Sequence, residues 1–562
     1  MKLSPLTRPF DVELTLPGSK SQANRTLIAA ALTEGRTIIE NATPCDDVAR
    51  MVDNLAAMGF DITWIDRRQG TVSIVGGVPT REGEATLDCG HAGTTLRFLT
   101  SLCCLVPGRW TLSGSKRLRE RPIEPLVAAL RQLGAEITDQ TGSLPLTIRG
   151  GTLRGGKVSI DGRATTQFAS ALRLVAPAVP GGIQVEVKDA GSVPYLELTE
   201  NVLSTFAASP VHGTSTPRRI SIEGDWSAAG AFLVLAKLTG SRLRPTNLSA
   251  NSAQGDRALP ELIASMRGPG NREIDCRGTP DQLMNLSILA ARRRGTTRFV
   301  GAASLRLKEC DRLAVLTREL RKAGIDIEEN DDGVTVHESP QLRAASLDPH
   351  DDHRMAMAFA LLATLHPGIE ILDPGCVSKS YPAFFEVLEK LHRAPLGFAF
   401  TGMRGAGKST LGRRWAAAQS LPFIDTDEWF EQEYGSISSF VEENGWPAFR
   451  ALEEDIVQSA LGPGRVVALG GGSSESPTNR HRLKEGGLTI FIDESLSRLE
   501  ARISIKSRPA LTQENPVAEL SALLEKRRPI YRDCAEITLP SNLTTEQQVS
   551  RLFKELEARC SW

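Results

Sequence analysis

Three stretches of the chain repeat one order of apolar and polar positions. LAAMGFDI from Leu55, LRQLGAEI from Leu130 and LRKAGIDI from Leu320 each read as a helix end, a glycine, an acidic residue and an isoleucine. Glycine accepts the left-handed backbone that closes many helices, and the residues after it suit the start of a strand. The irregular spacing of the copies excludes a solenoid. The pattern predicts a domain assembled from several copies of one helix–strand unit.

A change of pattern near residue 395 divides the chain. EVLEKLHR ends a helix, and LGFAFTG after it is a short apolar strand that runs into a glycine-rich loop. Downstream, PFIDTD, RVVALGGG, LTIFID and EITLP read as strands separated by helical stretches. Such alternation is typical of a parallel sheet covered on both faces. We therefore expect an α/β protein whose last domain, residues 395–562, holds a parallel sheet between helices.

Length and charge narrow the class of protein. A chain of 562 residues is too long to fold around a single hydrophobic core, since such cores stop growing at about 250–300 residues. Hydrophobic residues make up 41% and charged residues 24%, with 66 basic against 67 acidic side chains and 5% aromatics. These proportions indicate a folded multidomain protein. The near-neutral charge and the few aromatic residues argue against a nucleic-acid partner.

The cysteines and the apolar runs indicate the compartment. Nine cysteines form no CxxC pair, which argues against a disulfide framework and against a cysteine zinc site. The N-terminus lacks the apolar stretch of a signal peptide, and no apolar run is long enough to span a membrane. We expect a reduced, cytoplasmic protein with no membrane association and no protein partner.

A phosphate-binding motif follows the strand after residue 395. Residues 402–409 read GMRGAGKS, a complete G-x-x-x-x-G-K-[ST] P-loop. Its glycines let backbone N–H groups surround phosphate oxygens, and the following helix points its positive end at them. Lys408 is expected to reach the β- and γ-phosphates, and Ser409 to bind Mg²⁺.

Further polar motifs follow the next strands of this domain. Asp425 and Asp427 end the second strand, where residues i and i+2 point to the same side and into one crevice. Residues 470–472 are three glycines, which permit close approach of a small ligand. Arg450, Arg527 and Arg508, the last in a polar stretch suited to a lid, offer bidentate recognition of carboxylate or phosphate.

The order P-loop, DTD, FRxxE, GGG, RP and KRxP resembles the shikimate kinase family over residues 396–562. The resemblance implies that ATP is the co-substrate, that Ser409 and Asp425 serve Mg²⁺, and that Lys408 is catalytic. It implies an ATP site formed by Gly405, Ala406, Gly407, Lys408, Ser409, Thr410 and Arg508. It also implies a shikimate site formed by Asp427, Arg450, Gly471 and Arg527.

The N-terminal two-thirds carries cations beside glycines, prolines and helix-start signals, where anion sites form. PGSKSQANR places Lys20 and Arg25 at the positive end of a helix, and GHAGTT opens a second helix that contains Arg97. Similar cations occur in RERP at 119–122, in RLKECDR at 306–312, in DHR at 352–354 and at Lys379. The pattern indicates a basic pocket for two anions.

The motifs of this part of the chain are, in order, LPGSKSxxNR, GxAGTxxR, RERPIxPL, TTQF, SVPYLELT, EGDWSAA, QGD, LKExDR, DHRMAM and SKSYP. In this order they resemble the 5-enolpyruvylshikimate-3-phosphate (EPSP) synthase family. The resemblance implies a two-lobed enolpyruvyl transferase fold built from repeated helix–strand units, with a cleft that closes on the substrates. It implies one lobe from residues 1–18 and 223–394, a second from 19–222, and the kinase domain at 395–562. No cofactor is implied for the synthase.

The resemblance also assigns site residues. Shikimate 3-phosphate would be held by Lys20, Ser21, Arg25, Thr165, Thr166, Gln167, Ser192, Tyr195, Asp281 and Lys308. Phosphoenolpyruvate would be held by Lys20, Gly93, Arg121, Gln167, Arg312, Arg354 and Lys379. Asp281 and Glu309 are the candidates for base and acid, and Lys20 is expected to share proton transfer. His91 and Asp351 stand where the family pattern has asparagines.

Several alternatives stay open at this point. For the first part, the rival is the related transferase that acts on UDP-N-acetylglucosamine; for the second, it is a gluconate-type kinase. A third is an ATP-sensing regulator with an inactive kinase domain. We expect instead a bifunctional shikimate-pathway enzyme in which the kinase product is the synthase substrate. Its small-molecule partners would be shikimate, ATP, shikimate 3-phosphate and phosphoenolpyruvate.

Overall fold

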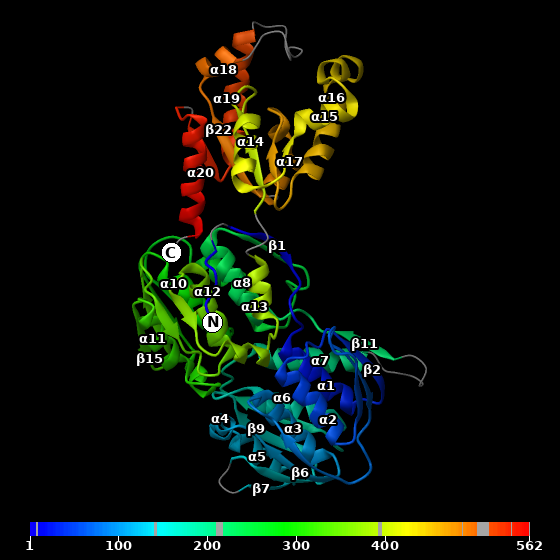
Figure 1. The fold of residues 1–562 in the computed structure, drawn as a ribbon. Helices are drawn as coiled ribbons and strands as arrows, with labels where there is room; N and C mark the ends of the chain where they lie inside the picture. The colour runs from blue at the N-terminus through cyan, green and yellow to red at the C-terminus, as the bar shows by residue number, and fades with distance from the viewer. Residues whose placement is uncertain are drawn as a thin grey trace.

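The computed structural model of the chain describes residues 1–6, 9–139, 143–208, 217–391, 396–485, 487–502, 516–540 and 542–560. Residues up to 391 form two lobes, and the rest forms a separate domain at one end (Figure 1). The expected α/β class, with a two-lobed part followed by a P-loop domain, is confirmed.

Three four-stranded sheets of the lobes share one strand order. In each, an edge strand runs parallel to its neighbour, and an antiparallel hairpin follows. Their strands, in sheet order, are β11 (Arg218–Ser221), β2 (Gly35–Glu40), β4 (Thr71–Gly76) and β3 (Asp61–Asp66); β5 (Gly83–Asp88), β6 (Gly108–Ser113), β8 (Leu146–Gly150) and β7 (Glu136–Asp139); β13 (Arg272–Asp275), β14 (Thr296–Val300), β16 (Gly333–His337) and β15 (Ile327–Asn330).

The predicted helix–glycine–strand repeats form the hairpin side of these three sheets. Helices α2 (Asp46–Ala57), α5 (Glu124–Gln132) and α11 (Arg312–Lys322) lead into β3, β7 and β15. The glycines between them, Gly59, Gly134 and Gly324, have φ of 93°, 86° and 88°. Only glycine adopts this left-handed backbone without steric cost. The repeat read from the sequence is therefore confirmed.

Parallel two-stranded sheets complete the lobes. They pair β1 (Asp11–Leu14) with β12 (Arg242–Pro245), β9 (Gly156–Asp161) with β10 (Ile183–Lys188), and β17 (Ala345–Leu347) with β18 (Ile369–Ile371).

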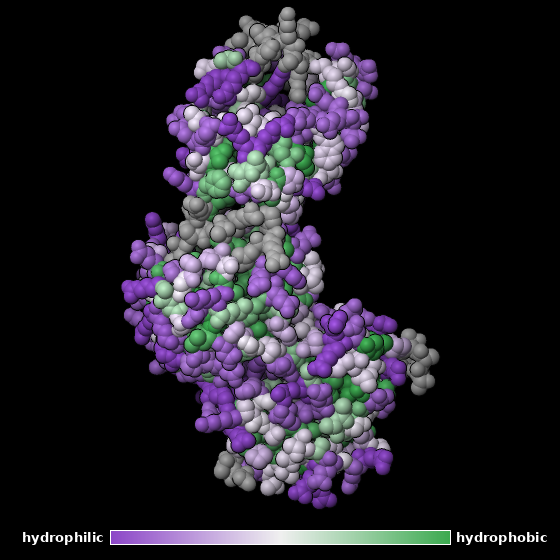
Figure 2. Space-filling model, in the orientation of Figure 1, coloured by the Kyte–Doolittle hydropathy of each residue, from purple (hydrophilic) through white to green (hydrophobic). Residues whose placement is uncertain are grey.

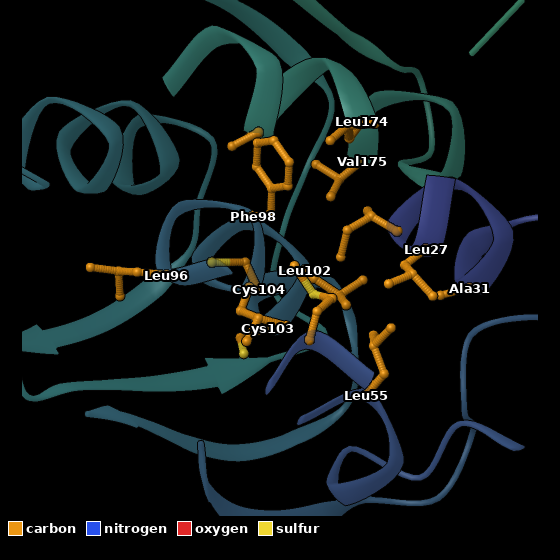
Figure 3. Packing of buried hydrophobic residues seen from close by; sticks show 14 of the residues in the cluster. Leu27, Ala31, Leu55, Leu96, Phe98, Leu102, Cys103, Cys104, Leu174 and Val175 are labelled. Carbon is orange, nitrogen blue, oxygen red and sulfur yellow. The ribbon is translucent and has the colours of Figure 1, made fainter. Parts of the chain in front are cut away.

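Each lobe is built around three buried helices that pack against one another. They are α1 (Lys20–Leu32), α3 (Gly93–Leu105) and α6 (Gln167–Val175) in one lobe, and α8 (Trp226–Thr239), α10 (Leu283–Ala291) and α12 (His353–Leu365) in the other. Helices that are apolar on all sides belong in a core. Figure 3 shows Phe98, Leu102 and Cys103 of α3 packed with Leu27 of α1 and Val175 of α6.

Two separate hydrophobic cores correspond to the two lobes. One is formed by residues from Ala23 to Ile222, and the other joins Leu3–Leu16 to residues from Ala228 to Leu391. The chain passes between the lobes twice, and at this crossing Gly18 and Gly224 form a β-bridge. A Cβ on Gly18 would lie 1.7 Å from the carbonyl oxygen of Asn41. A side chain is therefore excluded at this crossing.

The C-terminal domain contains the predicted parallel sheet. Its strands, in sheet order, are β20 (Phe423–Asp425), β21 (Val466–Ala468), β19 (Phe398–Thr401), β22 (Leu488–Asp493) and β23 (Ile537–Pro540), and all adjacent pairs are parallel. Its longer helices are α14 (Lys408–Gln419), α15 (Thr426–Tyr434), α16 (Ile437–Ala460), α17 (Pro477–Glu485), α18 (Leu496–Arg502), α19 (Pro516–Cys534) and α20 (Thr545–Cys560).

Among the described residues, few polar contacts join this domain to the lobes. The guanidinium of Arg242 lies 2.8 Å from the carboxylate of Glu536, and Leu396 donates its N–H to the carbonyl of Pro9. On the face shown in Figure 2, hydrophilic residues cover most of the lobes and of the C-terminal domain. Within the described ranges, the structure has no helix of the length and hydrophobicity needed to cross a bilayer. The eight cysteines with described side chains are all unpaired.

Candidate functional sites

Helix starts bring polar residues to the junction of the two lobes. Lys20, Gly93 and Gln167 are the first residues of α1, α3 and α6, Arg354 is the second residue of α12, and Asp281 lies in the 3-10 turn that leads into α10. The Ser19 hydroxyl caps α1 by accepting the N–H of Gln22. The positive end of a helix dipole favours anions. The fold therefore directs several positive helix ends toward one cleft.

Glu309 is surrounded by cations from both lobes. Its carboxylate lies 2.9 Å from Lys379 Nζ, 3.1 Å from Arg312 Nη2 and 3.6 Å from Arg121 Nη1. Burial alone would raise the pKa of Glu309, but Lys379, Arg121 and Arg312 together hold it well below its usual value. Glu309 is therefore ionised in this arrangement, and it balances cations that also suit a small anion.

Asp281 has a matching environment on the other side of Arg312. Its carboxylate lies 2.9 Å from Arg312 Nη1, 3.5 Å from Lys308 Nζ and 3.7 Å from Arg354 Nε. Burial alone would raise the pKa of Asp281, but Lys308, Arg312 and Arg354 lower it. The predicted base and acid thus share one cation, Arg312.

Lys20 lies beside this cluster, as predicted. Its Nζ atom is 3.0 Å from Asp47 Oδ2, and the same carboxylate group lies 3.9 Å from Lys379. Burial alone would lower the pKa of Lys20, but Asp47 and Glu309 raise it. Lys20 is therefore protonated in this arrangement, as a cation that suits a bound anion.

A second part of the cleft presents hydroxyl and amide groups. Among the predicted residues, Thr165, Thr166, Gln167, Ser192, Tyr195 and Lys308 line one pocket together with Arg97 and Arg121. The buried Ser192 hydroxyl has no hydrogen-bond partner within the described part of the chain. These donors suit a polyhydroxylated anion beside the cation cluster.

Arg25 is placed differently from the expectation of direct anion contact. It is 1% exposed and is not among the residues that line this pocket. Its guanidinium donates to Thr199 Oγ1, to the carbonyls of Ser21 and Tyr195, and more distantly to Ser170. Arg25 therefore orients Ser21 and Tyr195 through these hydrogen bonds. Its contact with a ligand stays a prediction.

Two residues outside the predicted set complete the synthase-like site. Asp47 bridges Lys20 and Lys379, and Asp352 accepts two hydrogen bonds from Arg312 at 2.7 and 3.1 Å while capping α12. Acidic residues at helix starts are ordinary capping signals, so the sequence pattern did not separate them from structural caps. His91 and Asp351 meet across the junction, 3.6 Å apart.

The P-loop of the C-terminal domain has the predicted form. Gly402, Gly405 and Gly407 have φ of 141°, 79° and 96°, and α14 begins at Lys408. The Lys408 ammonium donates to the carbonyls of Gly402 and Met403, at 2.9 Å each, and so lies folded over the loop. A cavity of about 880 Å³ opens above it and is lined by residues 404–410, Asp425, Asp427 and Gly471.

Asp425 and Asp427 both line this cavity, but not as two residues of one strand. β20 ends at Asp425, which caps α15 by accepting the N–H groups of Asp427 and Glu428. Asp427 therefore lies in the first turn of α15, because the capping carboxylate starts the helix earlier than the strand pattern predicts. The Ser409 hydroxyl donates to Asp425 at 2.5 Å.

The three glycines leave room for charged side chains. A Cβ on Gly470 would lie 2.8 Å from Asp427 Oδ1, and one on Gly472 would lie 2.2 Å from Arg450 Nη2. Arg450 packs over the rings of Trp446 and Phe449 and pairs with Glu453. The glycines therefore bring Asp427, Gly471 and Arg450 together, as the sequence predicted.

Arg527 reaches the same region through a partner that the sequence analysis missed. Its Nε and Nη2 atoms both donate to Glu475 Oε2, at 3.0 and 2.6 Å, while Lys526 lies 2.7 Å from Glu475 Oε1. Arg527 is only 6% exposed. Glu475 ends the short 3-10 helix η6 (Ser473–Glu475) and belongs to no motif, so only the fold brings it to Arg527. Arg508, the predicted lid residue, lies outside the described residues.

Asp256 is a buried carboxyl directly behind Asp281. It accepts hydrogen bonds from the Ser227 hydroxyl and from Gln282, the residue after Asp281. Burial and the neighbouring charge of Asp281 raise the pKa of Asp256 to about 6. Asp256 therefore holds the turn that contains Asp281. Ionisation of the buried Asp256 carboxyl lowers the stability of the folded state.

Comparisons with known proteins agree with both parts of the chain. The profile of the family EPSP synthase (3-phosphoshikimate 1-carboxyvinyltransferase) matches residues 7–388, and the shikimate kinase profile matches residues 404–557. The 3-phosphoshikimate 1-carboxyvinyltransferases of Citrobacter koseri and Escherichia coli are each 36% identical over 422 residues, covering 70% of this chain and 98% of the relative. A solved EPSP synthase from Acinetobacter baumannii shares the fold of the lobes, with a TM-score of 0.56 and 24% identity over 69% of this chain and 97% of that one.

We predict that Asp256→Asn changes the pH dependence of stability. The folded carboxyl keeps its proton up to a pH of about 6, whereas the unfolded one loses it near about pH 4. Between these values the folded state binds more protons, so the free energy of unfolding falls as pH rises. The variant lacks this loss. Its stability relative to the unsubstituted chain should therefore rise by roughly 1–3 kcal/mol from pH 4 to pH 7.

Calorimetry of the full chain at several pH values, following the transition of the lobes, measures this difference. Asp61→Asn is the matched control, because Asp61 is exposed and its substitution should give no such rise. A flat difference for Asp256→Asn between pH 4 and pH 7 would show that Asp256 ionises normally.

Proposed function

Because this chain belongs to the EPSP synthase family and carries a shikimate kinase domain, we propose how its own residues perform the two reactions. The C-terminal domain phosphorylates shikimate with ATP, giving shikimate 3-phosphate. The lobes transfer the enolpyruvyl group of phosphoenolpyruvate to the 5-hydroxyl of that product and release phosphate. The chain thus carries two consecutive steps, and the regulator alternative is not favoured.

The ring of cations around Glu309 and Asp281 carries the proposal for the synthase site. We assign the phosphoenolpyruvate site to Lys20, Gly93, Arg121, Gln167, Arg312, Arg354 and Lys379, which lie at the helix starts and in the cation cluster. We assign the shikimate 3-phosphate site to Lys20, Ser21, Thr165, Thr166, Gln167, Ser192, Tyr195, Asp281 and Lys308, with Arg25 acting through Ser21 and Tyr195.

Proton transfer follows from the two carboxylates. Asp281 takes the proton of the 5-hydroxyl as its oxygen forms a bond to C2 of phosphoenolpyruvate, and Glu309 delivers a proton to the methylene carbon C3. The tetrahedral adduct then loses phosphate: the bond between C2 and the phosphate oxygen breaks, and a proton leaves C3. Glu309 is ionised among its cations. The charge of phosphoenolpyruvate offsets these cations on binding, which raises the pKa of Glu309 toward that of a proton donor.

For the kinase we assign ATP to Gly405, Ala406, Gly407, Lys408, Ser409, Thr410 and Arg508, and shikimate to Asp427, Arg450, Gly471 and Arg527. The Ser409 hydroxyl and the Asp425 carboxylate are adjacent oxygen donors, which fits Mg²⁺. Bound there, Mg²⁺ would neutralise phosphate charge. Lys408 orients the γ-phosphoryl group, and Asp427 orients the attacking hydroxyl.

The domain boundaries are part of this proposal. We place one synthase lobe at residues 1–18 and 223–394, the second at 19–222 and the kinase at 395–562. The separate hydrophobic cores support these limits. The expected cytoplasmic location rests on the nature of the two enzymes.

We predict that the two activities separate by single substitutions. Lys408→Ala removes the P-loop cation and should lower the kinase rate by roughly 10²–10³-fold while sparing the synthase. Asp281→Ala removes the base and should lower the synthase rate by roughly 10²–10⁴-fold while sparing the kinase. Separate assays of each full-length variant check this. Loss of both activities in a folded variant would contradict independent sites.

We predict that Glu475→Gln weakens shikimate binding. Glu475 uses the Nε edge of Arg527, which leaves the Nη1 edge for the substrate carboxylate. Without this charge-assisted contact the KM for shikimate should rise by roughly tenfold, while the KM for ATP stays within about twofold. Asp455→Asn, on the exposed side of α16, is the matched control. A fall in the KM for shikimate would show that Glu475 competes with the substrate.

A further inference from the structure

One arginine of the 19–222 lobe binds three backbone carbonyls of the other lobe. Arg117 lies in the short helix α4 (Lys116–Glu120). Its Nε atom donates to the carbonyls of Lys308 at 3.1 Å and Glu309 at 3.2 Å, and its Nη2 atom donates to that of Arg306 at 3.2 Å. No motif and no assigned role covers this residue.

The carbonyls lie where a 3-10 turn, η4 (Ala303–Leu307), ends: Arg306 belongs to the turn, Lys308 is its C-cap, and Glu309 follows the cap. Carbonyls at the end of a helical turn lack partners within it and carry partial negative charge. A guanidinium satisfies several of them with charge-assisted hydrogen bonds. Arg117 therefore caps a turn of the opposite lobe, and the segment that it caps carries Lys308 and Glu309.

The helix α4 contacts this segment at a second point. Arg121, which ends α4, lies 3.6 Å from the carboxylate of Glu309. One rigid turn thus holds both the backbone and the carboxylate of Glu309. Besides the three carbonyls, Arg117 pairs with Glu120 of its own helix, 2.9 Å from its Nη1 atom, which fixes the direction of the guanidinium.

We propose that Arg117 is a positioning residue of the synthase reaction: it holds residues 306–309 of one lobe against α4 of the other and so keeps Glu309 among its cations. The proposal rests on the function proposed for Glu309. Because these hydrogen bonds cross the junction, they exist only while the lobes are together. Arg117 therefore couples the closed arrangement of the lobes to the geometry of the proton donor.

Steady-state kinetics of full-length Arg117→Ala tests the proposal. We expect the synthase kcat to fall by roughly 10–100-fold and its pH profile to shift, because the surroundings of Glu309 change. Because Arg117 also holds the backbone of Lys308, the KM for shikimate 3-phosphate should rise, but by less than kcat falls. Arg117→Lys, which keeps the charge but not the planar fork, should recover part of the rate. Calorimetry that follows the unfolding transition of the lobes reports whether the variant is folded.

Arg119→Ala is the matched control, because Arg119 lies on the same helix and is exposed. An Arg117→Ala enzyme that matches Arg119→Ala in kcat and in pH profile would overturn the proposal. If Arg117→Ala fails to fold, Glu120→Gln and Arg117→Lys carry the test: unchanged kinetics in both would overturn it equally. Full synthase activity in Glu309→Gln would instead overturn the function proposed for Glu309.

Discussion

The compensation of buried charge at the lobe junction is the constraint on which the rest of the synthase part depends. Arg312 is almost fully buried and pairs with Asp281, Glu309 and Asp352. Breaking one such buried pair costs about 3–5 kcal/mol, because an uncompensated charge remains. The cations and carboxylates therefore hold one another in place, and the same cations are the ones that we propose bind two anionic substrates.

The fold supplies these charges from distant parts of the sequence. Helices from both lobes start at the junction, and Lys20, Gly93, Gln167 and Arg354 are the first or second residues of these helices. The cations around Glu309 come from both lobes, and the hydrogen bonds of Arg117 run from one lobe to the other. The surroundings of Glu309 are therefore a property of the paired lobes and not of either lobe alone.

The sequence predicted the parts of this structure that depend on local pattern. The helix–glycine–strand repeats, the parallel sheet and the P-loop follow from backbone preferences and short-range periodicity. The sequence did not predict the partners that arise from long-range contact, such as Asp47 with Lys379 or Glu475 with Arg527. The sequence pattern also placed Asp427 on a strand. An aspartate that ends a strand cannot be told by pattern alone from one that caps the next helix, as Asp425 does. The hydrogen bonds of Arg25 to Thr199, Ser21 and Tyr195 were likewise not predicted, and its contact with a ligand stays a prediction.

The kinase domain makes the substrate of the lobes, so the central claim is that one chain carries out two consecutive reactions at two separate sites. The most direct test is ³¹P NMR of the full chain with shikimate, Mg²⁺–ATP and phosphoenolpyruvate. The account predicts loss of ATP with formation of ADP and shikimate 3-phosphate, followed by the enolpyruvyl product and free phosphate. Intact ATP, or shikimate 3-phosphate that accumulates without release of phosphate from phosphoenolpyruvate, would contradict it.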